Sequence, residues 1–196
     1  MKTNNSLRSS VFLVSFFLLT IFSFSQDLLA QKSLSGNKTS EIDYKKEAPD
    51  FSLLSLDGKT VNLTDYNDKI LVIHIATTWC PFCNAEAPYL EKLYQNYKAK
   101  GVEVIIIDVK EPKELVEEKL KDRHGLSFPI LLDPDGEVAG SFAPKNILPD
   151  LSRDEVMLAS NIIIDKEGKI QFMSLLDSKN FDAELIAVKK KLDELL

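Results

Sequence analysis

The run ILVIHIATTWCPFC, residues 70–83, decides the fold of this chain. Its first half, residues 70–76, is a short apolar run rich in β-branched side chains, which is typical of a strand covered on both faces. Cys80 and Cys83 follow, and beyond them apolar side chains recur at three- and four-residue steps. This spacing predicts an amphipathic helix with Gly101 as its stop signal. The sequence therefore places two cysteines where a buried strand passes into a helix.

Further strand and helix patterns lie on both sides of this unit. Upstream, two strand-like runs flank Asp57-Gly58, a pair suited to a tight hairpin turn. Downstream, the patterns predict a strand at 102–109, a helix at 114–123, a strand at 130–132, a hairpin of strands at 161–164 and 169–174, and a C-terminal helix with an apolar stripe from Phe181 to Leu195. This order predicts an α/β domain with a central mixed β-sheet flanked by helices and an N-terminal β-hairpin.

One connection is longer than the others. Residues 143–158 carry Pro144 and Pro149 and show no sustained strand or helix period. Because connections in compact domains are usually short, we expect this segment to be a lid or docking loop near the site.

Composition and charge narrow the functional class. A chain of 196 residues with 44% hydrophobic and 28% charged residues fits one globular domain with a short appendage. A formal net charge of -6 leaves no broad basic surface to follow a phosphate backbone, so nucleic acid is excluded as a partner. The only two cysteines would close a loop too small to stabilise a fold much, so their purpose is expected to be chemical.

The N-terminus has the pattern of an export signal. Lys2 and Arg8 precede an apolar run at 11–24, which is shorter than the about 20 residues that a membrane-spanning helix needs. We expect a signal peptide at 1–25, a polar linker at 26–46 and one domain at 47–196. The domain would then act in the periplasm or cell envelope, where disulfide chemistry is permitted. It would touch a membrane only if the N-terminal segment stays uncleaved.

The position of the cysteines predicts their roles. At a helix start, unpaired backbone N–H groups and the helix dipole stabilise a thiolate on the first sulfur. Cys80 is therefore predicted to be the nucleophile that attacks a partner disulfide, and Cys83 the thiol that resolves the mixed disulfide. Pro81 fits the first helical position, where its missing N–H costs nothing, and it is also a candidate for contact with the substrate.

Three neighbouring side chains are further candidates. Trp79 and Phe82 would form an apolar collar for an extended substrate chain, although aromatic residues beside a strand end are as often core. Glu86 lies one turn after Cys83, near enough to exchange a proton with the resolving thiol. The alternative for Glu86 is a solvated first-turn carboxylate favoured by the dipole.

Several segments together resemble the thioredoxin superfamily, most closely its exported TlpA/ResA-like branch, which is related to the AhpC/TSA group. The resemblance covers residues 48–170 and rests on these stretches: Ala48-Pro49-Asp50-Phe51, Ala76 to Cys83, Glu86 with Pro88, Phe128 to Asp133, and Ile162 to Ile170. It implies a thioredoxin fold, electron exchange with protein thiols and disulfides, an upstream thiol electron donor and, in some relatives, reduction of apocytochrome c cysteines. No cofactor and no metal is implied, and we expect a monomer.

The chain departs from the family pattern at two places. Many relatives have a cis-proline just before the strand that here begins near Asn161, and Ala159 stands close to that position. Ala159 is therefore a candidate substrate-binding residue whose docking role differs from the family's. The second departure is the dipeptide Pro81-Phe82 between the two cysteines. This branch often has its proline at the second of these two positions rather than at the first. Because the dipeptide influences the reduction potential, the direction of electron flow stays open.

Two other functions remain as alternatives. A peroxiredoxin-like thiol peroxidase would need an activating arginine, and the mature chain holds only Arg123 and Arg153. A metal-binding or structural module would use the cysteines with His74 and His124, whose spacing matches no zinc-finger pattern. His74, inside the buried strand, is predicted to be a core or near-site histidine, and His124 a helix-end residue.

Overall fold

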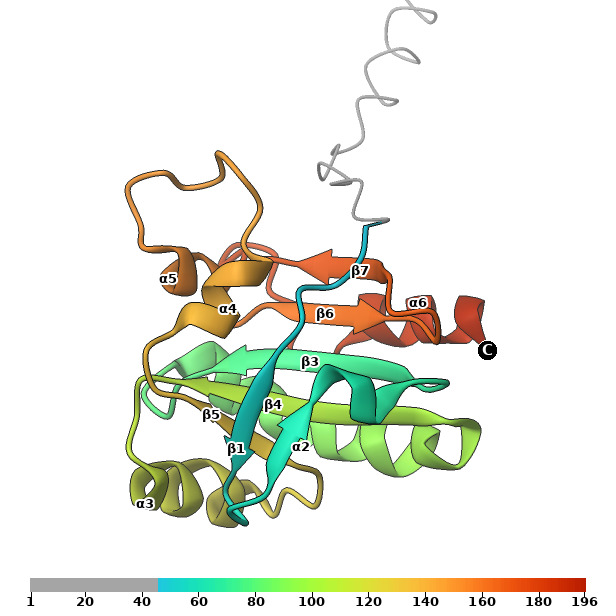
Figure 1. The fold of residues 1–196 in the computed structure, drawn as a ribbon, viewed down its shortest axis with the longest axis horizontal. Helices are drawn as coiled ribbons and strands as arrows, with labels where there is room; N and C mark the ends of the chain where they lie inside the picture. Colours follow the sequence, from blue (N-terminus) through green and yellow to red (C-terminus); the bar gives the residue numbers. More distant parts are fainter. Residues whose placement is uncertain (1–45) are drawn as a thin grey trace, which may run out of the picture. The chain divides into compact units, whose positions relative to one another are not determined.

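The computed structural model describes residues 46–196 (Figure 1). The signal segment predicted at 1–25 and all but the last residue of the predicted linker lie outside the described residues. Within residues 46–196, no helix combines the length and apolar character that crossing a membrane requires.

A seven-stranded sheet forms the centre of the domain, with strand order β2-β1-β5-β4-β3-β6-β7. Its strands are β1 (Ser52–Ser55), β2 (Thr60–Asn62), β3 (Ile70–Ala76), β4 (Val102–Val109), β5 (Ile130–Asp133), β6 (Asn161–Ile164) and β7 (Ile170–Ser174). Strands β3, β4 and β5 run parallel, whereas β1 is antiparallel to β5 and β6 to β3. The predicted mixed sheet and its N-terminal hairpin of β1 and β2 are confirmed.

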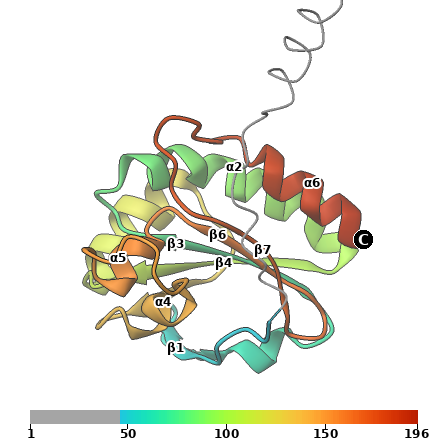
Figure 2. The same cartoon turned by 90° about the horizontal axis from the view of Figure 1, so that it is seen from above.

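Helices cover both faces of this sheet. They are α2 (Pro81–Tyr97), α3 (Lys113–Val116) with its π-helical continuation η3 (Glu117–Asp122), α4 (Glu137–Phe142), α5 (Arg153–Met157) and α6 (Ile186–Leu195), with short 3-10 turns η1 (Leu63–Tyr66) and η2 (Lys98–Lys100). One core cluster joins Leu90 of α2, Leu120 of η3 and Leu192 of α6 to Val72 of β3. Figure 2 shows α2 and α6 on one side of the sheet and α4 on the other. Strand β3 is buried along its whole length because it is covered on both faces.

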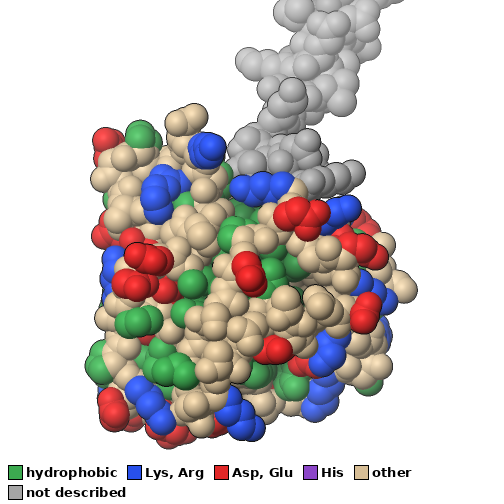
Figure 3. All heavy atoms as spheres, viewed as in Figure 1, with side chains coloured by type: hydrophobic (Ala, Val, Ile, Leu, Met, Phe, Trp, Pro, Cys, Tyr) green, Lys and Arg blue, Asp and Glu red, His purple; other side chains and the backbone are tan. Residues whose placement is uncertain are grey.

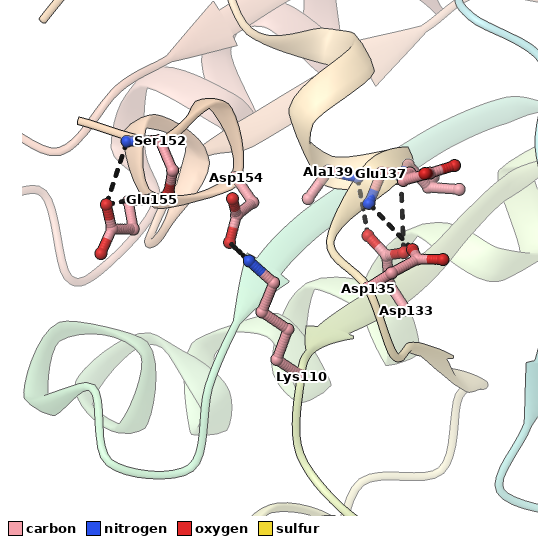
Figure 4. Close-up of polar contacts among 9 residues, drawn as sticks. Lys110, Asp133, Asp135, Glu137, Ala139, Ser152, Asp154 and Glu155 are labelled. Carbon is pink, nitrogen blue, oxygen red and sulfur yellow. Dashed lines mark hydrogen bonds and ion pairs between the residues drawn. The ribbon is translucent and has the colours of Figure 1, made fainter. Parts of the chain in front are cut away.

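Helices α4 and α5 were not predicted from the sequence. The carboxylate of Asp133 accepts the backbone N–H groups of Val138 and Ala139, which would otherwise be unpaired at the start of α4 (Figure 4). Ser152 and Glu155 form a reciprocal capping box at the start of α5. The segment expected to be an irregular loop at 143–158 therefore ends in a helix.

The C-terminal helix is shorter than predicted. Leu185 has a left-handed backbone with φ +57°, so α6 begins only at Ile186. Asp182 supports this start because its carboxylate accepts the backbone N–H of Ala187 at 2.8 Å. Phe181 lies before the helix and packs edge-to-face on Phe82, with ring centroids 4.8 Å apart.

The surface charge agrees with the composition. Figure 3 shows acidic and basic side chains interspersed on the face that it draws, without a broad basic area. That pattern fits the formal net charge of -6 and gives nucleic acid no positive track on this face.

Candidate functional site

Cys80 is the N-cap residue of α2. Its sulfur accepts the backbone N–H of Cys83 at 3.2 Å, and Pro81 occupies the first helical position. A hydrogen bond from the Cys83 thiol, helped by backbone N–H groups, lowers the pKa of Cys80 to about 7 although burial opposes the change. A large thiolate fraction is therefore present at neutral pH.

Cys83 has the opposite electrostatic environment. It is 1% exposed, and its sulfur lies 3.9 Å from the carbonyl oxygen of Ile75. The hydrogen bond to Cys80, burial and the negative charge of Cys80 all raise the pKa of the Cys83 thiol. Both cysteines are free and buried in the structure. At neutral pH these pKa shifts leave Cys80 partly ionised and Cys83 protonated.

Glu86 lies on the buried face of α2, one turn beyond Cys83, and is 3% exposed. The predicted alternative, a solvated first-turn carboxylate, is wrong because the sheet covers this face of the helix. Burial raises the pKa of Glu86 to about 8, against a hydrogen bond from Asn161 Nδ2 to Glu86 Oε1 at 3.1 Å. Glu86 therefore changes its protonation near neutral pH, as a proton-exchanging group must.

An apolar groove of about 290 Å³ runs beside Cys80. Its wall includes all four predicted residues around the motif, Trp79, Cys80, Pro81 and Phe82, together with Leu148, Leu151, Glu155, Val156, Leu158, Leu175 and Leu176. Trp79 is 68% exposed, which excludes the interpretation of this side chain as core. Contact of Trp79, Pro81 and Phe82 with a substrate stays a prediction.

Ala159 lies in a different cavity from the groove. It is buried, has φ +58°, and donates its backbone N–H to the carbonyl of Ile75 at 2.9 Å. Together with Glu86 and Asn161 it lines a smaller cavity of about 80 Å³. Its neighbour Leu158, not Ala159 itself, reaches the groove. The substrate-binding role predicted for Ala159 stays a prediction.

Two carboxyl groups next to the motif were missed by sequence reasoning. Glu111 accepts both the backbone N–H and the hydroxyl of Thr78, the latter at 2.7 Å, which fixes the turn before Cys80. Asp108 is fully buried, and burial together with the charge of Glu111 raises its pKa to about 8. The sequence did contain a signal, because Asp108 is an acidic residue within the run of buried apolar residues that ends β4.

The two histidines lie in different surroundings. His74 is buried beside Glu86 and Asn161, whereas His124 Nε2 lies 3.0 Å from Asn84 Oδ1. Among residues 46–196, no three His, Cys, Asp or Glu side chains are grouped so that they could bind a metal ion.

Comparison with known proteins agrees with this geometry. The AhpC/TSA family model matches residues 44–173. The chain belongs to the AhpC/TSA family. This AhpC/TSA member is 34% identical over 134 residues to the thiol-disulfide oxidoreductase ResA of Bacillus cereus, covering 68% of this chain and 70% of that protein. It is 38% identical over 124 residues to ResA of Geobacillus thermodenitrificans, covering 63% and 64% of the two chains.

Solved structures show the same fold. The thioredoxin domain of a thiol-disulfide oxidoreductase from Bacteroides vulgatus aligns with a TM-score of 0.59 at 23% identity, covering 76% of this AhpC/TSA chain and 98% of that one. A secreted Mycobacterium tuberculosis disulfide oxidoreductase homologous to E. coli DsbE aligns with a TM-score of 0.59 at 19% identity, covering 74% and 96%. The predicted thioredoxin fold is confirmed, and the chain is a protein thiol-disulfide oxidoreductase by family and relatives.

Proposed function

We propose that this protein exchanges disulfides with extracytoplasmic protein partners through Cys80 and Cys83. The observation that carries the proposal is the pairing of a thiolate-forming Cys80 at the wall of a groove with a protonated, buried Cys83 one helical turn behind it. A nucleophile must meet the partner, and a resolving thiol must stay protected until the mixed disulfide exists.

The exchange then has two steps. The Cys80 thiolate attacks a partner disulfide, forming a mixed disulfide and releasing one partner sulfur as a thiolate. Cys83 next loses its proton and attacks the Cys80 sulfur, which forms the Cys80–Cys83 disulfide and releases the second partner sulfur. The two electrons of the dithiol pass to the partner, and the released thiolates take protons from solvent. In the reverse direction the same steps oxidise a partner dithiol.

Glu86 is the group best placed to take the proton of Cys83. It follows Cys83 by one turn on the same buried face, and its pKa near 8 leaves a minority of carboxylate at neutral pH that can accept this proton. The small cavity that Glu86 lines supplies space for water, through which the proton reaches solvent.

The groove favours an extended polypeptide with apolar residues next to its cysteine. Leu148 and Trp79 are 53% and 68% exposed on its walls, so a partner side chain placed there would cover apolar surface. The export pattern at the N-terminus favours partners in the cell envelope, and apocytochrome c is the substrate class that the TlpA/ResA-like resemblance suggests. The Mycobacterium tuberculosis disulfide oxidoreductase that shares this fold is a secreted protein, which supports this location.

The reduction potential of the cysteine pair tests the function. The chain has a single tryptophan, Trp79, directly before Cys80, so its fluorescence is expected to report the redox state in a glutathione or dithiothreitol titration. A potential at or below about -250 mV would indicate a protein that reduces partners such as apocytochrome c. A potential of about -120 to -180 mV would indicate an oxidant or isomerase. The absence of a reversible two-electron transition would overturn the proposal and favour the peroxidase or metal alternatives.

A further inference from the structure

A buried histidine lies directly behind the cysteine pair. His74 sits in the centre of β3 and lies on the same face of the strand as Val72 and Ala76, which pack on the α2 side of the sheet. Its Nδ1 atom lies 3.0 Å from Oδ1 of Asn161 and 3.3 Å from Oε2 of Glu86. The three side chains come from β3, β6 and α2, and all are buried.

The hydrogen-bond pattern fixes which nitrogen of His74 carries the proton. Asn161 donates through Nδ2 to Oε1 of Glu86, so its carbonyl oxygen is the atom that faces His74. A carbonyl oxygen can only accept, and therefore Nδ1 must carry the hydrogen. The same Nδ1–H lies beside Oε2 of Glu86, which has no aligned hydrogen-bond donor among the described residues.

This arrangement has an energetic cost that packing alone does not explain. Nε2 of His74 is buried and makes no aligned hydrogen bond within residues 46–196, although the Ser160 backbone lies near enough to the ring to favour its protonated form. An unsatisfied buried polar atom destabilises a fold, and the rest of β3 is apolar. An isoleucine or valine would fill the position without that penalty, so a polar role of the imidazole accounts for its presence.

We propose that His74 is a positioning residue whose Nδ1–H, held by Asn161, stabilises the carboxylate of Glu86 in the state that accepts the proton of Cys83. The inference rests on the proposed function, in which Glu86 takes that proton. The step transfers one proton from the Cys83 sulfur to a Glu86 oxygen, leaving a Cys83 thiolate that attacks the Cys80 sulfur.

The groups around Glu86 show why it needs such a donor. Burial, the charge of Asp182 before α6 and the charge of Cys80 on α2 all favour the neutral carboxylic acid. Cys83, also on α2, is a neutral thiol until it reacts. The hydrogen bond from Asn161 on β6 opposes these effects. Nδ1 of His74 on β3 lies 3.3 Å from the other carboxyl oxygen of Glu86, close enough to add to this opposition. Burial lowers the pKa of His74 to about 4, so the imidazole acts as a neutral dipole rather than as a cation.

Substitutions of His74 test this role through the pH dependence of the resolving step. A mixed disulfide between Cys80 and a small thiol is formed, and release of that thiol is followed in a single turnover at several pH values. We expect His74→Leu to move the inflection assigned to Glu86 upward by about one pH unit and to slow release at neutral pH about tenfold. His74→Gln keeps an N–H donor and should restore most of the rate, and His124→Gln is the matched control that should match wild type.

Nitrogen NMR on the unmodified protein provides a test that does not depend on the folding of a variant. With two histidines in the chain, His124→Gln assigns the imidazole signals of His74. We expect the Nδ1–H tautomer, with an Nδ1 shift that changes as Glu86 titrates and does not change in Glu86→Gln. The Nε2–H tautomer, or an unshifted inflection in a folded His74→Leu variant, would overturn the inference. If Glu86→Gln itself kept the wild-type pH profile, the proposed role of Glu86 as proton acceptor would be wrong as well. The proposed function is tested separately, because disulfide exchange that persists in Cys80→Ser would overturn it.

Discussion

The Cys80 sulfur accepts the backbone N–H of Cys83 at 3.2 Å, so the two cysteines are electrostatically coupled before any disulfide forms. The coupling lowers the pKa of Cys80 to about 7 and raises that of Cys83. The pair is thus asymmetric in the reduced state.

The alkylation rate of Cys80 should follow this asymmetry. We expect the rate with iodoacetamide to rise with pH and reach half its maximum near pH 7, because only the thiolate reacts. Cys83 should stay unmodified over the same range because its raised pKa keeps the thiol protonated. Mass spectrometry of the modified peptides measures both. In Cys83→Ser the midpoint should move up toward about 8.5, and an unchanged midpoint would contradict the role of the Cys83 thiol.

Replacing Glu86 by glutamine should stabilise the protein above pH 5. The folded protein keeps a proton on Glu86 up to about pH 8, whereas the unfolded chain loses it near pH 4.5, so wild type loses stability as pH rises between these values. We expect Glu86→Gln to raise the free energy of unfolding by roughly 2–3 kcal/mol at pH 7 and by almost nothing near pH 4.5. Urea unfolding at a series of pH values measures the difference.

Glu91, on the same helix, serves as a control because its pKa is shifted in the opposite direction. Burial acts against its ionisation, but hydrogen bonds from Ser127 and Gln95 outweigh burial and lower its pKa. Its carboxylate therefore stabilises the fold above pH 4.5, and this contribution is lost as pH falls. Glu91→Gln should reduce stability most at neutral pH. A pH-independent effect of Glu86→Gln would show that packing, not ionisation, decides the difference.

Substrate affinity should depend on the exposed leucines of the groove. Leu148 is 53% exposed on the groove wall, and Leu54 on β1 is 54% exposed away from it, which makes a matched pair. We expect Leu148→Ser to slow exchange with a disulfide-containing protein about fivefold, because covering half a leucine contributes about 1 kcal/mol. Exchange with dithiothreitol, which leaves the groove walls uncovered, should not change. Equal effects of Leu148→Ser and Leu54→Ser would rule out the groove as the docking surface.

Introducing proline at position 159 should destabilise this fold. Ala159 has φ +58° and donates its N–H to Ile75, whereas proline requires φ near -65° and has no N–H. We expect Ala159→Pro to lower the free energy of unfolding by about 3 kcal/mol in urea titration. Ala159→Gly, which accepts the positive φ, should unfold at or above the wild-type midpoint. A proline variant as stable as wild type would mean that the chain adopts another backbone conformation there.

The sequence alone determined the central architecture and the location of the chemistry. The buried run of β3, the helical period of α2 and the hairpin around Asp57-Gly58 are local patterns, and each was confirmed. The position of Cys80 and Cys83 at the strand-to-helix junction follows from the same run. Such features can be predicted from the sequence because burial and backbone conformation impose a periodic spacing of apolar residues along a strand or helix.

Only the tertiary structure decided what surrounds the cysteines. Helices α4 and α5 are too short to show a clear period, and contacts such as that of Lys110 with Asp154 at 2.7 Å hold α5 in place (Figure 4). The contact of His74 with Glu86 and Asn161 joins residues from three elements, and the groove joins Cys80 to Leu148. These residues are far apart in the chain, and no local pattern records which of them meet. Their contacts, and the pKa values that depend on them, are set by how the helices pack on the sheet.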